Sequence, residues 1–334
     1  MTWIADSGAY RQAYINAVTQ ANDGSVLDPQ FVADLSLPQA VAVHESYFAS
    51  EIRLLVMGQE TKGKEADPDR FGYNGVTPEH AWADATGPGI AAAYQSAGPF
   101  WQAFNLFCGR FGRADTCSVA WSNVSKAQVL APHNGSVAVH NHPNFNAQQY
   151  GDWQAELFRA EIEFLKPHAV LAFVGPNEHG ELLHTMLNHG APVGAHAAWR
   201  DKDGYRIWSR PGLKYCLVSA YHPNGYAARV PPAESAENAT YALMRLLKQQ
   251  GPSVPLPPHS WPQRLRAETQ SHLACPAADI VGTRLKHADG RFGTIMKKVD
   301  GWPWPIVVED RYSYACNPYE SVEDLVVKGW VIDE

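Results

Sequence analysis

The sequence predicts an α/β protein in which a four-stranded parallel sheet is flanked by helices and followed by a small C-terminal β barrel. Four short, mostly apolar runs each end in turn residues, as strands buried on both faces of a sheet do. Helical patterns lie between and after the later runs, and alternation of strand and helix produces a parallel sheet through right-handed crossovers. A proline-rich stretch then leads into short β runs separated by turns, which is typical of a small barrel of the SH3 or Tudor kind.

The four predicted strands share an aliphatic and aromatic composition, and turn or polar residues follow each of them directly. Runs of this length and character favour strands over helices. In chain order the predicted strands are Ile52–Met57, Ser118–Trp121, Ala169–Val174 and Tyr215–Ala220.

Three helices are predicted between and after the later strands. Trp153–Leu165 carries its large apolar side chains at helical spacing, and Lys166-Pro167 ends it. Glu181–Leu187 is a shorter candidate and Ser235–Gln249 a longer one. Residues 1–50 are also expected to be mostly helical.

This pattern divides the chain into three parts. Residues 1–250 are predicted to form the α/β domain, with a helical N-terminal extension, and residues 277–334 the small β barrel. Residues 251–276 are predicted to be a linker, because their first half is rich in proline and such segments act as semi-rigid spacers.

Composition limits the classes of function. The net charge of −7 counts against broad coating of a phosphate backbone, although it allows a local basic surface. The five Cys residues are scattered without a CxxC pair, which excludes a disulfide framework and a four-Cys metal site. No secretion signal opens the sequence, and no run of about 18 apolar residues occurs. We therefore expect a cytoplasmic protein. The sequence does not fix the oligomeric state, for which a monomer is favoured, and no metal or cofactor is expected.

Polar side chains follow three of the predicted strands at the point where each strand ends. Glu60 follows the first strand, Asn123 the second and His222 the fourth. Ligands of open parallel sheets bind beyond the carboxyl ends of the strands, so we expect these side chains to line one pocket. Each has an ordinary alternative, as a solvated carboxylate, a turn cap or a buried histidine, and only their combination favours a site.

Four segments, in the same order along the chain, resemble motifs of the uracil-DNA glycosylase superfamily. Leu54–Gly63 resembles the first motif, in which a strand ends in an acidic residue that positions the attacking water. Trp121–Val124 resembles the strand end whose Asn binds the flipped base, and Ala169–Gly175 the next core strand. Ser219–Gly225 resembles the motif whose His stabilises the departing base. The resemblance covers about residues 50–250.

The resemblance implies a role for each polar residue. Glu60 would orient water and stabilise positive charge on the sugar, Asn123 would bind the base, and His222 would stabilise the charge that leaves on it. Gln59 and Asn224, beside these residues in the motifs, would also contact the substrate. No metal is required for this chemistry.

An aromatic side chain is needed to hold a base that has been flipped out of the stack. Phe71 and Tyr73, in the loop after the first motif, are the candidates, with a role as plain loop anchors as the alternative. Lys214 and Arg229, near the last strand and its His loop, are candidates for contacts to DNA phosphates, or else solvated surface charges.

The departures from the family pattern concern the substrate. Glu60 stands where the family has Asp, and Lys62 and Gly63 stand where uracil-specific members have the Tyr that blocks a 5-methyl group and its His neighbour. Space is therefore predicted at the 5-position of the base. By analogy with members that act in antiphage defence, the expected substrate is DNA with hydroxymethylated or glucosylated cytosine, cleaved to an abasic site.

Three other functions stay open on the sequence. The chain could be a uracil-DNA glycosylase of base-excision repair, a non-catalytic nucleic-acid-binding module, or a hydrolase of free nucleosides, which the acidic net charge favours. His140-Asn141-His142 could contribute to a zinc site if a third ligand were near, but a loop or surface role for this segment is favoured.

Overall fold

The structure is a computed structural model that describes residues 3–5, 8–59, 77–86, 98–113, 115–131, 135–175, 178–190, 196–200, 204–209, 213–223, 232–250, 263–274, 280–287, 292–296, 306–310 and 316–333. Its contacts divide the chain into two compact units. The first unit comprises residues 1–109 and 113–239, and the second comprises residues 110–112 and 240–334.

The first unit is an α/β structure built on one sheet of six strands, in the order β4-β3-β7-β10-β9-β8. The four predicted strands are all present and mutually parallel, with every residue of the three inner ones buried. They are β3 (Leu54–Gly58), β4 (Ala120–Asn123), β7 (Ala169–Phe173) and β10 (Cys216–Ala220). The continuous apolar runs thus correctly marked the parallel core of the sheet.

The sheet is mixed, however, and the prediction of four strands was incomplete. β8 (His196–Arg200) and β9 (Tyr205–Ser209) form an antiparallel hairpin, and β9 pairs antiparallel with β10. In β9 the buried Tyr205 and Trp208 are separated by half-buried Arg206 and Ile207. The sequence of β9 therefore contains no continuous apolar run that would indicate a strand. Gly204, with φ of 72°, lies in the turn just before it.

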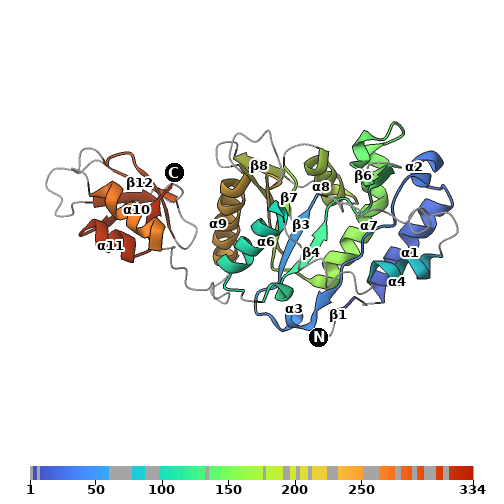
Figure 1. The fold of residues 1–334 in the computed structure, drawn as a ribbon, viewed down its shortest axis with the longest axis horizontal. Helices are drawn as coiled ribbons and strands as arrows, with labels where there is room; N and C mark the ends of the chain where they lie inside the picture. The colour runs from blue at the N-terminus through green and yellow to red at the C-terminus, as the bar shows by residue number, and fades with distance from the viewer. Residues whose placement is uncertain are drawn as a thin grey trace. The chain divides into compact units, whose positions relative to one another are not determined.

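Helices cover both faces of this sheet (Figure 1). α7 (Ala147–Leu165), α8 (Glu178–Asn188) and α9 (Pro232–Gln250) each contain a predicted helix and extend it by a few residues. The residues of α9 from Thr240 on belong to the second unit. The side chain of Asn146 caps the start of α7, and Lys166, in the left-handed conformation with φ of 46°, ends it.

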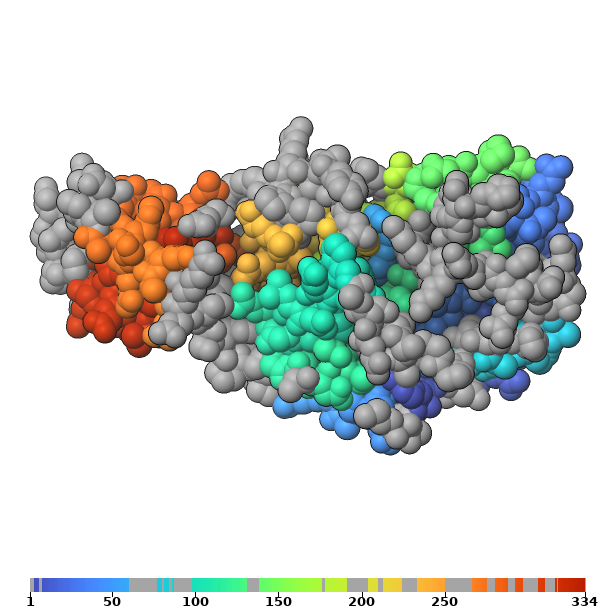
Figure 2. All heavy atoms as spheres, in the orientation of Figure 1, coloured from blue at the N-terminus to red at the C-terminus, as the bar shows by residue number. Residues whose placement is uncertain are grey.

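The N-terminal region is mostly helical, as predicted, and α1 packs along both α7 and α4. The remaining elements of the first unit are β1 (Trp3–Ile4), α1 (Ala9–Asn22), α2 (Pro29–Ala33), β2 (Val43–His44), α3 (Glu45–Ala49), α4 (Pro78–Ala85), α6 (Pro99–Arg110), η1 (Thr116–Ser118), β5 (Val129–Ala131), β6 (Gly135–Val137) and η2 (Val139–Asn141). In Figure 2, α6 (teal) forms part of the molecular surface, where its Gln102, Asn105 and Leu106 are exposed.

A buried ion pair joins the loop after β4 to α7. Lys126 Nζ lies 2.7 Å from Glu161 Oε2, and both side chains are fully buried. The same ammonium donates to Ser122 Oγ (2.6 Å), while Tyr10 OH donates to Glu161 Oε2 (3.3 Å). Burial lowers the pKa of Lys126, and the adjacent Glu161 carboxylate opposes that shift. The network links α1, α7 and the end of β4 through groups that are costly to bury unless paired.

The segment 34–39, between α2 and β2, runs along residues 126–130. Ser36 N donates to Gln128 O (2.8 Å), Gln39 N to Lys126 O (2.6 Å) and Leu130 N to Asp34 O (2.7 Å). An antiparallel bridge joins Leu35 to Val129. Backbone hydrogen bonds therefore attach part of the N-terminal region directly to the loop that follows β4. We call this segment the N-terminal strip.

The second unit contains a five-stranded antiparallel sheet, in the order β14-β13-β12-β11-β15. Its elements are α10 (Gln263–Leu273), β11 (Arg284–His287), β12 (Phe292–Ile295), β13 (Ile306–Asp310), β14 (Cys316–Tyr319), α11 (Val322–Val327) and β15 (Trp330–Ile332). The predicted short strands are thus present, but they form a half-barrel. Among the described residues, strand pairing begins at β14 and ends at β15. Trp330 is fully buried in its core, and its Nε1 donates to Tyr319 OH (2.5 Å).

The range 251–276, predicted as a linker, includes part of this unit. α10 packs against α11 and β15, and Thr269 Oγ1 of α10 accepts a hydrogen bond from Ile332 N (3.1 Å). Its sequence, Gln-Arg-Leu-Arg-Ala-Glu-Thr-Gln-Ser-His-Leu, is so polar that it resembles a solvated segment. Residues 251–262, which carry the proline-rich sequence, lie outside the described residues.

Candidate functional site

The carboxyl ends of the four parallel strands lie level with one another. Gly58 of β3 is in register with Asn123 of β4, and Phe173 of β7 is in register with Ala220 of β10. Gln59 and His222 follow these strand ends directly or after one residue. The register therefore brings polar residues from distant parts of the sequence to one edge of the sheet, where open α/β sheets bind ligands.

Asn123 is held firmly at this edge. Its side chain is 2% exposed, and its Nδ2 donates to Gln39 Oε1 (2.5 Å). The loop behind it is fixed to β3, because Val124 N donates to Gly58 O (2.9 Å) and Ser125 N donates to Gln59 O (2.8 Å). A carboxamide positioned in this way is a preorganised hydrogen-bonding group.

Phe100, near the start of α6, connects the Asn123 and His222 ends of the edge. Its ring is stacked with that of His222 at a centroid distance of 6.3 Å and an interplanar angle of 14°. It meets Phe173 edge-on at 6.0 Å. A Cβ added to Gly58 would lie 3.3 Å from Phe100 Cε2 and would collide with Asn123 Oδ1. The Phe100 ring thus stacks with His222, and Phe100 and Asn123 both border the space over Gly58; we call these residues the Phe100 cluster.

Gln59 follows β3, which is paired with β7. In the sheet, the strand that comes after β3 in the chain lies on one side of this pair (β4), and the next parallel strand after β7 lies on the other side (β10). Gln59 Nε2 donates to Val174 O (3.4 Å), and the Gln59 side chain is half-buried. This is the switch point of the sheet, the usual position of a ligand in such folds.

Lys214 does not join this cluster. It is exposed and precedes β10, whereas His222 follows it. A strand of five residues spans roughly 17 Å, so the two residues lie at opposite edges of the sheet. The other predicted site residues lie outside the described residues: Glu60, Lys62, Gly63, Phe71, Tyr73, Asn224 and Arg229.

Two residues of the cluster were not found from the sequence. Gln39 lies in Leu-Pro-Gln-Ala, within a region whose sequence carries no functional signal, and Phe100 lies in Gly-Pro-Phe-Trp. The segment Gly-Pro-Phe-Trp does indicate the start of a helix, since proline favours the first helical position. Only the hydrogen bonds of the N-terminal strip and the packing of α6 bring these residues to the sheet edge.

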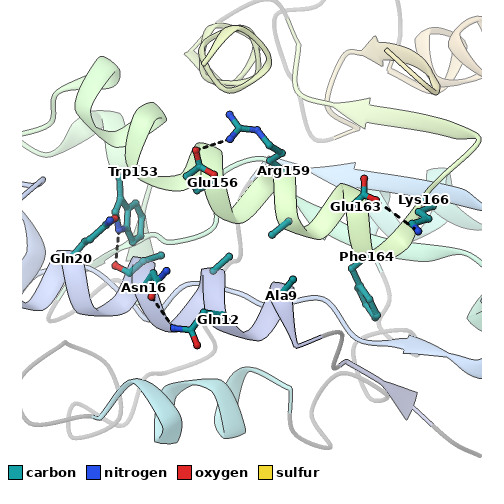
Figure 3. A pocket seen from close by; sticks show the side chains of 13 residues that line it. Ala9, Gln12, Asn16, Gln20, Trp153, Glu156, Arg159, Glu163, Phe164 and Lys166 are labelled. Atoms are coloured by element: carbon teal, nitrogen blue, oxygen red, sulfur yellow. Dashed lines mark hydrogen bonds and ion pairs between the residues drawn. The ribbon is translucent and has the colours of Figure 1, made fainter. Parts of the chain in front are cut away.

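A large surface groove lies away from this cluster, between α1 and α7. It encloses about 950 Å³. Figure 3 shows paired polar side chains around it, with Glu156 bound to Arg159 and Glu163 to Lys166 along α7. Alanines also line it, and the exposed ion pairs are typical of a solvated groove between two helices.

A smaller hollow of about 440 Å³ lies among η2, the start of α7 and the start of α8. His140 lines it and meets His179 edge-on at 5.7 Å. His142, the other histidine of the noted pair, instead contacts Asp34, with 3.1 Å between Nε2 and Oδ2. In the part of the chain that the structure describes, no three His, Cys, Asp or Glu residues are grouped so as to hold a metal ion.

Cysteine chemistry is also disfavoured at the described positions in the first unit's core. Burial raises the pKa of Cys108 and of Cys216 to about 12 each. Neither thiol therefore forms a thiolate nucleophile near neutral pH.

Gly58→Ala is expected to reduce the activity of this site about 100-fold, because the new methyl group must displace the Asn123 carboxamide. Rates and thermal unfolding should be measured together. Gly109→Ala is the matched control, since an added Cβ there meets nothing within 4 Å. Full activity of a Gly58→Ala protein would mean that the position of Asn123 is unimportant.

No family model matches this chain, and a search of curated proteins finds no match. Among the described residues, no helix combines the length and apolar character needed to cross a membrane.

Proposed function

We propose that this protein is a DNA glycosylase that removes a 5-modified pyrimidine, such as hydroxymethylated or glucosylated cytosine, and leaves an abasic site. The observation that carries the proposal is that His222 stacks with Phe100 while Asn123 and Phe100 border the same space over Gly58, at the carboxyl edge of the parallel strands. A glycosylase needs a hydrogen-bonding group for the base, a donor for the departing charge, and an aromatic face.

The proposed reaction is a hydrolysis. Water adds to C1′ of the sugar, the glycosidic bond breaks, and its electron pair leaves on the base. His222 would stabilise that charge, Asn123 would bind the base edge, and Glu60, adjacent to Gln59 in the sequence, would accept the proton of the water. Phe100 takes over, in this proposal, the stacking role that Phe71 and Tyr73 hold on the sequence alone.

The substrate class rests on Lys62 and Gly63, which replace the two residues that close the uracil pocket in the family that the sequence resembles. A side chain placed against C5 rejects substituents strongly, and its absence admits them. Phage genomes carry such bulky bases, so the proposed role of the enzyme is defence against those phages.

The protein is expected to form more abasic sites on DNA with hydroxymethylated or glucosylated cytosine than on uracil DNA. Lys62→Tyr should suppress cleavage of the bulky bases, because the ring would refill the space at C5. Abasic sites are scored by strand scission in alkali. Lys248→Tyr, at an exposed position of α9, is the matched control.

Three results would contradict the proposal. Cleavage of uracil DNA alone would indicate uracil repair, and cleavage of free nucleosides without cleavage of DNA would indicate a nucleoside hydrolase. Binding of DNA with no abasic sites on any of these bases would indicate a non-catalytic module.

A further inference from the structure

The hollow among η2, the start of α7 and the start of α8 plays no part in the proposed hydrolysis. It encloses about 440 Å³, which lies within the range of small-molecule sites, roughly 300–1,000 Å³. Its walls are mostly apolar and include Val139, Phe145, Ala147 and Leu182. The hollow therefore has the size and the walls of a site for one small chemical group.

Three polar side chains lie among these apolar walls. His140 Nδ1 is buried, and no residue that the structure describes forms a hydrogen bond with it. Glu178 and Glu181, in the first turn of α8, are exposed and also line the hollow. An imidazole nitrogen pairs with a hydroxyl in either tautomer and a carboxylate accepts from one, whereas carboxylates repel a phosphate. The hollow therefore suits a neutral ligand that has both hydroxyl groups and an apolar face.

The α8 wall of the hollow adjoins the carboxyl end of β7. In Figure 1, α8 lies at the end of the sheet opposite α3, the helix that precedes β3 in the chain. A Cβ added to Gly180 would collide with Gly175 O, at 2.7 Å, and Gly175 lies two residues after β7. Val174, the residue between, accepts the hydrogen bond from Gln59 Nε2. The start of α8 is therefore next to the contact that Gln59 makes.

The α7 wall leads to the same residue. The ring of Phe145 lies 5.7 Å from that of Tyr150, and Tyr150 OH lies 2.9 Å from Ser125 Oγ. Ser125 N in turn donates to Gln59 O (2.8 Å). Short chains of contacts thus connect both walls of the hollow to Gln59, at the switch point of the sheet.

Gln59 also adjoins the proposed base site. It directly follows Gly58, over which Phe100 and Asn123 border one space. Lys62 and Gly63, whose types predict room at the 5-position of the base, follow Gln59 by three and four residues in the sequence. A substituent that extends from C5 past Gln59 would therefore reach the hollow.

We propose that the hollow is a sugar subsite, which binds a hexose attached through the 5-hydroxymethyl group of the base. The sugar hydroxyls would bind His140 and the two glutamates, and its C–H face would pack on Phe145. This inference rests on the proposed function and narrows its preferred substrate from 5-hydroxymethylated to 5-glucosylated pyrimidines.

The test compares two DNAs that differ only in the sugar, namely 5-hydroxymethylcytosine DNA with and without glucose on the hydroxymethyl group. The measured quantity is the ratio of kcat/KM for the glucosylated over the unglucosylated DNA, which is expected to exceed one in the parent. Ala147→Trp places a bulky ring in the hollow from an exposed position and should lower the ratio about 100-fold. Glu181→Ala removes one hydrogen-bond acceptor and should lower it about tenfold.

Each substitution has a matched control in the other groove, between α1 and α7. Ala9, like Ala147, is the exposed first residue of a helix, and Glu163, like Glu181, is an exposed helical glutamate. Ala9→Trp and Glu163→Ala should keep the ratio of the parent. Thermal unfolding of all four variants reports whether each has folded.

Methyl glucoside distinguishes a sugar carried on DNA from a free saccharide. Without the base it is expected to bind weakly, so that millimolar methyl glucoside leaves the thermal unfolding of the parent unchanged. Stabilisation by methyl glucoside, with equal ratios for the Ala147→Trp protein and the parent, would assign the hollow to free saccharides and overturn its role towards DNA. A parent that cleaves the unglucosylated DNA at least as well as the glucosylated DNA would overturn the sugar subsite while leaving the glycosylase intact. Failure to cleave either DNA would overturn the glycosylase, and this inference with it.

Discussion

Replacing His222 or Asn123 with Ala is expected to slow base excision by roughly two to four orders of magnitude, as loss of a charge-stabilising donor does. His222 stacks with the Phe100 ring, and Asn123 borders the space over Gly58 together with Phe100. The measurement is single-turnover cleavage of DNA with 5-hydroxymethylcytosine, which separates the chemical step from product release.

Matched controls exist for both substitutions. His184 is exposed on α8 and Asn16 is exposed on α1, so alanine at either position should leave the rate within about twofold of the parent. Thermal unfolding of the Asn123→Ala protein distinguishes a lost contact to substrate from a damaged fold. If the His222 and Asn123 variants remain as active as their controls, these residues have no part in the chemistry.

Breaking the buried ion pair should have the largest effect on stability. Glu161→Ala leaves the ammonium of Lys126 buried and uncompensated, and such losses cost about 3–5 kcal/mol of unfolding free energy. The double variant Lys126→Met, Glu161→Leu should recover most of that loss, because a buried pair can often be replaced by apolar side chains of similar size. Urea unfolding followed by tryptophan fluorescence measures both.

The same helix supplies the control. Glu156 pairs with Arg159 at 2.6 Å, but both side chains are more than half exposed, with 63% and 52% of their surfaces accessible. Glu156→Ala should therefore change stability by less than about 1 kcal/mol. Equal losses from Glu161→Ala and Glu156→Ala would show that the buried network contributes nothing special.

The sequence predicted the parallel strands well because burial on both faces leaves a direct mark, a run such as Ala169–Phe173 without polar residues. It missed the β8–β9 hairpin because an edge hairpin needs only partial burial, and Arg206 interrupts its apolar pattern. It took α10 for linker because that helix is polar except for the few residues that dock on α11 and β15.

The residues of the candidate site likewise divide into those that the sequence predicted and those that it missed. Asn123 and His222 could be proposed because they lie at strand ends, Asn123 as the last residue of β4 and His222 two residues after β10, and strand ends are visible in the sequence. Gln39 and Phe100 could not, because they reach the site through tertiary contacts alone. For Gln39, these contacts are the hydrogen bonds to the loop after β4, and for Phe100 they are ring contacts across the sheet edge. Neither the hydrogen bonds of Gln39 nor the ring contacts of Phe100 leave a recognisable pattern in the neighbouring sequence.

The N-terminal strip has a consequence for the order in which the protein is made. Gln39 leaves the ribosome long before residues 126–130, to which its segment is hydrogen-bonded, and longer still before His222. Contacts between distant parts of a chain form slowly, since the entropy of closing the loop between them must be met first. A nascent chain that ends before β10 therefore contains Gln39 and Asn123 but lacks His222, so the proposed glycosylase would become active only once synthesis of the α/β unit is nearly finished.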